Sequence, residues 1–116
     1  MRILVTGGAG FIGSHVIKKL LQNKENMVFN LDKMGYASST YMLDKLINEN
    51  SSISSNQYKF LNIDLSSKPE TEKAIEEAKP NLIMHLAAES HVDRSIDGPE
   101  EFIKSNIVGT FNLLES

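Results

Sequence analysis

The sequence predicts an α/β fold in which a doubly wound parallel sheet of about four strands, in the order 3-2-1-4, carries helices on both faces. Short apolar segments alternate along the 116 residues with longer segments whose apolar residues recur at helical spacing. The first apolar segment also runs directly into a glycine-rich turn. Right-handed crossovers place such alternating strands in one parallel sheet. At this length we expect one domain, the amino-terminal half of such a fold.

The first part of the chain contains two strand-and-helix units. A strand is predicted over residues 3–6 and a helix over residues 11–24. A second apolar strand follows over residues 27–31 and a second helix over residues 41–47. The Ser- and Asn-rich segment 48–56 is then predicted to be a surface loop.

The second part repeats this order of elements. A third strand is predicted over residues 58–63. The helix after it starts near Pro69 and ends before Pro80, because proline is tolerated in a first helical turn and not in a helix interior. A fourth apolar strand is predicted over residues 82–86, followed by a loop over residues 88–98.

A last helix is predicted after Asp97 and Glu100, which offer an amino-terminal cap. Its apolar side is expected to comprise Phe102, Ile103, Ile107, Phe111 and Leu114. The chain ends at Ser116 without a glycine cap, a basic last turn or a proline, so we expect a helix cut short in a longer protein. The fourth strand would then be an unpaired sheet edge, and we expect a homodimer.

Composition and charge exclude several classes of partner. The formal net charge is −3 and no run of Lys or Arg occurs, which argues against nucleic acid and anionic membranes, since both need a concentrated basic face. There is no cysteine, so disulfides and thiolate metal sites are excluded. No stretch approaches the roughly 18 apolar residues of a membrane span, and glycines interrupt the amino terminus too early for a signal peptide. We expect a cytoplasmic protein that binds a small ligand.

The turn after the first strand, Gly-Gly-Ala-Gly-Phe-Ile-Gly at residues 7–13, has glycines where a dinucleotide-binding turn needs them. Gly7 allows the tight turn, Gly10 lets a pyrophosphate approach the backbone, and Gly13 lets the helix pack against the sheet. The helix amino terminus offers free N–H groups to phosphates. Asp32 ends the next strand 19 positions after Gly13, where an acceptor for ribose hydroxyls belongs.

Asp32 also predicts which dinucleotide binds. A carboxylate accepts hydrogen bonds from a ribose 2′-hydroxyl and repels a 2′-phosphate, so NAD is favoured over NADP. Lys33 either offsets this repulsion with its positive charge or is simply a solvated side chain. Asp64, at the end of the third strand, either caps the turn that follows or hydrogen-bonds the adenine amino group.

The segment His-Leu-Ala-Ala-Glu-Ser-His-Val-Asp-Arg-Ser-Ile-Asp-Gly-Pro at residues 85–99, followed by Asn-Ile-Val-Gly-Thr at residues 106–110, resembles the signature of the dTDP-glucose and UDP-glucose 4,6-dehydratases. These enzymes belong to the extended short-chain dehydrogenase/reductase superfamily, which shares the glycine turn and Leu-Ala-Ala. The resemblance spans nearly the whole chain and is weakest over residues 38–56. It implies a Rossmann-like NAD-binding half-domain and a nucleotide-sugar substrate used in deoxysugar biosynthesis.

The resemblance also implies which residues contact the cofactor. Residues 11–12 would contact the pyrophosphate, residues 32–35 the adenosine ribose, residues 64–65 the adenine and residues 86–90 the nicotinamide side. Ser90 would also touch the sugar. The predicted cofactor-binding set is Gly7, Gly10, Phe11, Ile12, Gly13, Asp32, Lys33, Met34, Gly35, Asp64, Leu65, Leu86, Ala87, Ala88, Glu89, Ser90 and Ser105. The last of these replaces a threonine that is more common in the family.

The implied reaction is an internal redox cycle in which hydride leaves the sugar C4 for NAD, water is lost across C5 and C6, and hydride returns to C6. Its Tyr-x-x-x-Lys base pair and its Asp and Glu acid/base pair are expected beyond Ser116. We therefore predict that the chain lacks both, holds no catalytic residue and is inactive alone. Tyr36, Tyr41 and Tyr58 precede the strand that should lead to the catalytic helix. The alternatives are a related epimerase or decarboxylase, or a non-enzymatic dinucleotide-binding module.

Several histidines and acidic residues have structural interpretations. His85 within an apolar strand and His15 on the first helix are predicted to be structural. Glu89, His91 and Asp93 alternate in a loop, a spacing too unspecific to predict a metal site, and we expect no metal.

Overall fold

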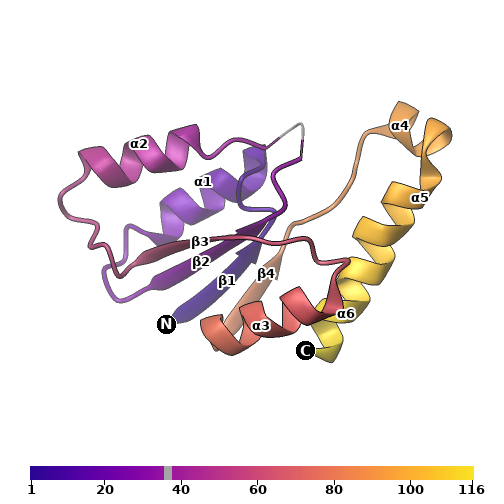
Figure 1. Ribbon diagram of the computed structural model, residues 1–116. Helices are drawn as coiled ribbons and strands as arrows, with labels where there is room; N and C mark the ends of the chain where they lie inside the picture. The colour runs from indigo at the N-terminus through magenta and orange to yellow at the C-terminus, as the bar shows by residue number, and fades with distance from the viewer. Residues whose placement is uncertain (36–37) are drawn as a thin grey trace.

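A central parallel sheet organises the fold, and its strand order β3-β2-β1-β4 confirms the predicted order. In the computed structural model, which describes residues 1–35 and 38–116, the strands are β1 (Arg2–Thr6), β2 (Met27–Asp32), β3 (Tyr58–Asn62) and β4 (Leu82–His85). All neighbouring strands are parallel, and Ile3 of β1 lies between Val28 of β2 and Leu82 of β4. β1 is thus an inner strand, and β3 and β4 are the edges (Figure 1).

Helices cover both faces of the sheet, as predicted (Figure 1). α1 (Phe11–Leu20) and α2 (Tyr41–Glu49) lie on one face, and α3 (Lys68–Ala78) and α6 (Gly109–Glu115) lie on the other. Between β4 and α6 the chain forms α4 (Val92–Asp97), α5 (Pro99–Phe102) and a π-helix, η1 (Ile103–Val108). Among the described residues, no helix is both long enough and apolar enough to cross a membrane.

Alternation of side chains along β1 divides the core into two layers. Ile3 and Val5 pack with Ile17 of α1 on one face, whereas Leu4 packs with Leu113 of α6 on the other. These five side chains are at most 7% exposed. Burial on both faces explains why β1 is apolar along most of its length, and it fixes the carboxyl ends of the strands, where the site lies.

The predicted end of the first helix is wrong. α1 ends at Leu20 and not at residue 24. The Leu20 carbonyl accepts hydrogen bonds from the Asn23 backbone N–H at 3.3 Å and from the Asn26 side-chain amide at 3.0 Å. These bonds replace the continuing helical ladder, because an asparagine side chain competes with the backbone at helix ends.

The predicted loop over residues 88–98 is also partly wrong, because it contains α4. The Gly98 backbone N–H donates to the Arg94 carbonyl at 2.9 Å and closes the last turn of this short helix. Pro99 then begins α5, where its fixed φ suits a first helical turn. The segment after β4 is therefore more ordered than its loop-like composition indicates.

The predicted apolar side of the last helix is wrong. Its members Ile103, Ile107, Phe111 and Leu114 are 52–80% exposed, and we call these four residues the outer stripe. The buried side instead contains Gly109 and Asn112. The Asn112 amide donates to the Leu65 carbonyl at 2.8 Å, and a Cβ on Gly109 would lie 3.1 Å from the Leu65 Cβ. The four residues recur at intervals of four, four and three, so they stay on one side of the helix, and that side is exposed.

Candidate functional site

A pocket of about 450 Å³ opens at the carboxyl edge of the sheet. This edge, at the strand where the sheet order reverses, is where open α/β sheets bind ligands. The lining residues are Gly7, Gly10, Phe11, Ile12, Gly13, Leu31, Asp32, Lys33, Gly35, Ser38, Ile63, Asp64, Leu65, Leu86, Ala87, Ala88, Glu89, Ser90 and Ser105. The structure thus brings together every residue of the predicted set except Met34, and their contact with NAD stays a prediction. Leu31, Ser38 and Ile63 were not predicted.

At two positions of the glycine turn, backbone atoms leave no room for a side chain. Gly7 has φ +70°, and a Cβ there would lie 2.7 Å from the Ala87 backbone nitrogen. A Cβ on Gly13 would lie 2.2 Å from the Gly7 carbonyl oxygen. α1 begins at this turn, and no side chain caps its amino terminus. The turn therefore presents a bare helix amino terminus to the pocket, an arrangement that attracts phosphate.

Asp32 ties the glycine turn to the segment after β2. Asp32 is 7% exposed, and its carboxylate accepts hydrogen bonds from the backbone N–H of Ala9 at 3.0 Å, the backbone N–H of Met34 at 2.8 Å and the Ser38 hydroxyl at 3.0 Å. A carboxylate has about four acceptor positions, and the described residues fill three of them, which leaves one for a ligand hydroxyl.

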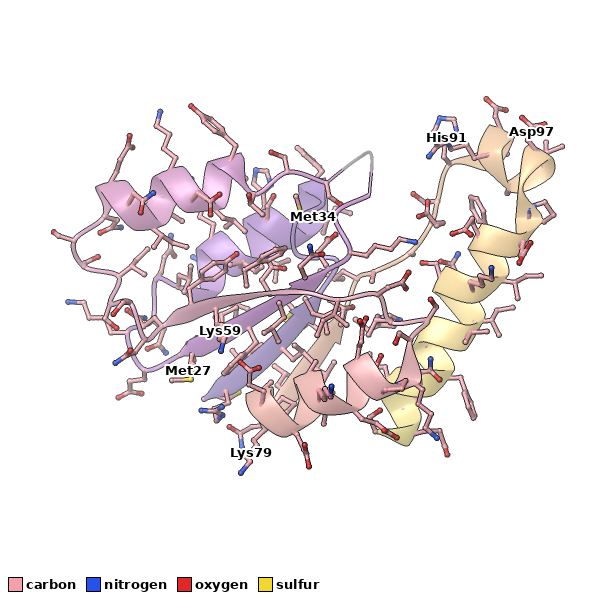
Figure 2. The ribbon with its side chains drawn as sticks, viewed as in Figure 1. Met27, Met34, Lys59, Lys79, His91 and Asp97 are labelled. Atoms are coloured by element: carbon pink, nitrogen blue, oxygen red, sulfur yellow. The ribbon has the colours of Figure 1, made fainter. Side chains whose placement is uncertain are left out.

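Met34 lies outside the pocket lining, and its contact with the adenosine ribose stays a prediction. Its backbone is left-handed, with φ 57°, and its N–H points to Asp32. Figure 2 shows Met34 beside the sheet edge where β2 ends. Its contribution is thus to orient Asp32. Sequence reasoning could not find this role, since a left-handed methionine has no characteristic sequence pattern.

An ion pair joins the two sides of the pocket. Lys33 Nζ, after β2, lies 3.4 Å from Glu89 Oε1, after β4, and the two side chains are 30% and 25% exposed. The positive charge of Lys33 is therefore compensated within the protein. Neither of the two predicted interpretations of Lys33, a free cation or a purely solvated side chain, describes it.

Residues 86–90 form the wall of the pocket after β4. A side chain that sequence reasoning missed holds this wall in place. The Asn106 amide of η1 donates to the Glu89 carbonyl at 2.9 Å and its oxygen accepts the Glu89 N–H at 2.8 Å. This pair of bonds fixes Glu89 as a neighbouring strand would. Asn106 lies in the segment 106–110, which resembles the family signature. That resemblance was the sequence feature that could have identified Asn106 as a site residue.

Asp64 serves the turn after β3 and also borders the pocket. Its carboxylate accepts the Ser66 backbone N–H at 2.9 Å, which is the capping role predicted as one alternative. The same residue and Leu65 line the pocket, so the adenine contact stays open.

A Tyr-x-x-x-Lys sequence does occur within the chain, at Tyr41 and Lys45, and the prediction that the motif is absent is wrong in that respect. Both residues lie on α2, both are exposed, and neither lines the pocket. Tyr58 packs against the core on β3, and Tyr36 lies outside the described residues. The spacing at Tyr41 is thus a coincidence of an amphipathic surface helix.

The alternating acidic and histidine residues after β4 do not converge. His91 precedes α4 at a distance from the sheet, in the region where Figure 2 also labels Asp97. Within residues 1–35 and 38–116 there is no group of three or more His, Asp or Glu side chains placed to hold a metal ion.

The glycine turn, the acidic end of β2 and the pocket across the carboxyl edge define a Rossmann-like dinucleotide-binding domain. Residues 4–116 match the family described as GDP-mannose 4,6 dehydratase, and the chain belongs to that family. A curated relative, the dTDP-glucose 4,6-dehydratase of Salmonella typhimurium, is 47% identical over 115 residues, which are 99% of this chain and 30% of the relative. The resemblance to nucleotide-sugar 4,6-dehydratases is thereby confirmed.

Solved structures of nucleotide-sugar enzymes also superpose on this chain. The dTDP-glucose 4,6-dehydratase DesIV of Streptomyces venezuelae, solved as a double mutant with NAD and DAU bound, superposes with a TM-score of 0.83 at 36% identity, over 99% of this chain and 35% of that one. The UDP-glucose 4-epimerase of Thermus thermophilus, in complex with NAD, superposes with a TM-score of 0.78 at 34% identity, over 99% of this chain and 33% of that one. The chain spans about 30% of the length of the curated relatives it matches.

Proposed function

We propose that this chain is the NAD-binding part of a dTDP-glucose or UDP-glucose 4,6-dehydratase. The observation that carries the proposal is the pocket itself, which assembles five separated segments of the predicted cofactor set. Two curated relatives that are 47% identical to this chain are named dTDP-glucose 4,6-dehydratase. In the whole protein, NDP-glucose would become NDP-4-keto-6-deoxyglucose by loss of hydride from C4, loss of water across C5 and C6, and return of hydride to C6. NAD supplies the reversible hydride acceptor.

NAD is the proposed cofactor in preference to NADP. The Asp32 carboxylate has a position left for a ribose hydroxyl and would repel a 2′-phosphate. Lys33 does not offset that repulsion, since Glu89 compensates its charge. The Asp32 carboxylate and the Lys33–Glu89 ion pair therefore both favour NAD over NADP.

The small side chains of the wall after β4 support the proposal that the nicotinamide and the sugar bind on that side of the pocket. Ala87 and Ala88 leave space for the two rings to approach within hydride-transfer distance. Ser90 borders the same pocket and is proposed to touch the sugar. The 116-residue chain alone is proposed to turn over no sugar, because among the described residues the pocket lining contains no tyrosine, and its lysine, Lys33, is paired with Glu89.

Calorimetric titration with NAD and NADP tests the proposal, using the chain, Asp32→Ala and the matched control Asp44→Ala, which removes an exposed carboxylate on α2. We expect NAD to bind more tightly than NADP, Asp44→Ala to bind as the unaltered chain does, and Asp32→Ala to lose most NAD affinity. Equal binding of NAD by all three proteins would contradict the assigned role of Asp32. A chain that binds neither dinucleotide would contradict the proposed function.

An NAD-dependent nucleotide-sugar epimerase is a second candidate, favoured by the similarity to the Thermus epimerase. The two reactions begin alike, and only the dehydratase releases water and leaves a 6-deoxy sugar. Incubating the full-length protein with dTDP-glucose or UDP-glucose and identifying the product by NMR distinguishes them. A 4-keto-6-deoxy product supports the dehydratase, and a C4 epimer supports the alternative.

We also propose that the chain forms a homodimer in the cytoplasm. The outer stripe supports this proposal, because four large apolar side chains on one side of a helix are costly to leave in water. The edge position of β4 is the feature from which the sequence predicted association.

A further inference from the structure

Thr6 lies at the carboxyl end of β1, and its hydroxyl has all of its hydrogen-bonding positions filled. The backbone N–H of Ala87 donates to its oxygen at 3.2 Å, and the backbone N–H of Leu86 is shared at 3.1 Å between this oxygen and the Thr6 carbonyl. A hydroxyl has two acceptor positions and one proton to donate. Both acceptor positions are taken, so the proton is directed to the remaining neighbour, His85 Nδ1, at 2.6 Å.

This arrangement determines the protonation of His85. Because Thr6 has no acceptor position left, Nδ1 must be the acceptor and carries no proton. The proton of the neutral ring is then on Nε2, which lies 2.9 Å from the Thr110 hydroxyl oxygen. Thr110 in turn donates to the Asn106 carbonyl at 2.7 Å. The donors therefore run in one direction, from the amides after β4 to the carbonyl of Asn106.

The two ends of this chain of hydrogen bonds hold the two ends of the pocket wall at residues 86–90. Thr6 binds the first amides of the wall, and the Asn106 side chain binds Glu89 through both its N–H and its carbonyl. His85 stands between these two anchors and connects β1 to α6 through its two ring nitrogens.

Burial lowers the pKa of His85, so the neutral ring that the geometry requires is also the form that the surroundings favour. The groups that face the ring from β1 and α6 are the neutral hydroxyls of Thr6 and Thr110. The charged side chain of the pocket wall, Glu89, is paired with Lys33. Protonation would place an N–H on Nδ1 against a hydroxyl whose acceptor positions are in use, and one existing bond would have to break.

We infer that His85, as the neutral Nε2–H tautomer, is a positioning residue that holds the pocket wall of residues 86–90 between Thr6 and Asn106. Protonation of the ring, or loss of either hydroxyl partner, releases the wall. The consequence for cofactor affinity rests on the proposed function, whereas the positioning itself can be measured without any cofactor.

NMR of the ¹⁵N-labelled chain tests the positioning. Long-range ¹H–¹⁵N spectra identify the tautomer of His85, and hydrogen exchange reports on the Leu86 and Ala87 amides. We expect the Nε2–H tautomer at neutral pH, with both amides losing protection only once acidification has charged the His85 ring, as the NMR spectra themselves report. An Nδ1–H tautomer, a charged ring at neutral pH, or amide protection that ignores the titration would overturn the inference.

A matched pair of variants separates hydrogen bonding from shape. Thr110→Val removes the hydroxyl that receives the Nε2 proton, and Thr110→Ser keeps it. We expect amide exchange at Leu86 and Ala87 to become about tenfold faster in Thr110→Val, the size expected for one lost hydrogen bond, and to stay unchanged in Thr110→Ser. Equal exchange in the two variants would contradict the role of His85. The pH series on the unaltered chain decides the matter even where Thr110→Val fails to fold.

Titration with NAD at a pH where the NMR spectra show the His85 ring neutral, and at a lower pH where they show it charged, completes the test. We expect affinity to fall about tenfold at the lower pH and in Thr110→Val at the higher one, with Thr110→Ser unchanged. A chain that shows the expected tautomer and exchange but binds no NAD contradicts the proposed function and leaves the positioning role standing. A chain that binds NAD equally at both pH values overturns the link between His85 and the cofactor.

Discussion

Single atoms at the glycine turn decide whether the pocket can form. Gly7 lies so close to Ala87 that a Cβ on Gly7 would meet the Ala87 backbone nitrogen. Gly13 in turn lies against the Gly7 carbonyl. Each contact is with backbone, which cannot rotate away as a side chain can. The turn can therefore pack against the wall after β4 only because these glycines carry no Cβ.

Gly13→Ala should destabilise the fold, because its Cβ would lie 2.2 Å from a backbone oxygen. We expect a loss of about 1–3 kcal/mol in the free energy of unfolding, the usual cost of overpacking, measured by urea denaturation. Gly35→Ala is the matched control, since a Cβ there meets nothing within 4 Å. Equal stability of the two variants would show that the turn relaxes without cost.

Glu89→Gln should weaken the discrimination against NADP. Without its carboxylate partner, the ammonium group of Lys33 becomes available to a 2′-phosphate. We expect the ratio of NADP to NAD affinity to rise about threefold, since partly exposed ion pairs are worth under about 1 kcal/mol. Lys33→Met in the Glu89→Gln background should reverse the change. An unchanged ratio in Glu89→Gln would mean that Lys33 lies beyond reach of the ribose.

At the level of the elements, the connection from β4 to α6 carries most of what positions the pocket wall. η1 turns Asn106 toward Glu89, and α6 anchors to the turn after β3 through Asn112. π-helical turns often occur at functional sites, where they redirect a side chain. Here the redirected side chain is an amide that binds backbone.

Asn106→Asp should loosen this connection, because a carboxylate accepts the Glu89 N–H but cannot donate to the Glu89 carbonyl. We expect a loss of about 1–3 kcal/mol in the free energy of unfolding together with weaker NAD binding. Asn48→Asp, on the exposed side of α2, controls for the added charge. Stability equal to that of Asn48→Asp would contradict the assigned role of Asn106.

Sequence patterns predicted the strands and the first three helices because each has its own apolar period and its own glycine, proline or acidic boundary. The pocket lining was predictable because its residues follow strand ends in recognisable motifs. The outer stripe was misplaced because helical spacing shows that its residues share one side of the helix but does not show whether that side faces the sheet. The partners of His85 were missed because they lie 79 and 25 residues away in sequence, and only the finished packing of β4 against β1 and α6 brings them together.

On the scale of the whole molecule, the outer stripe and the edge strand β4 both lie on the part of the chain after residue 80. In the part of the chain before residue 80, α1, α2 and α3 pack their buried side chains into the two core layers. Association is therefore expected at this end of the molecule, away from the other edge strand, β3.

Ile107→Glu should make the chain monomeric, because it places a charge in the middle of the outer stripe. Light scattering over a range of concentrations should show a dimer for the unaltered chain and a monomer for the variant. Ile96→Glu is the control, since Ile96 is 75% exposed on α4 and outside the stripe. A dimer that persists in Ile107→Glu would place the contact at the β4 edge instead.

The inner position of β1 has a consequence for how the chain is made. β1 leaves the ribosome before one of its two neighbours, β4, which begins at Leu82. A partial sheet of β1, β2 and β3 can assemble early, but one side of β1 stays open until β4 has been synthesised. Thr6 lies at the carboxyl end of that open side and has no His85 to bond until then. The pocket wall of residues 86–90 is thus completed after the glycine turn, and a chaperone at the ribosome would meet that turn before the pocket exists.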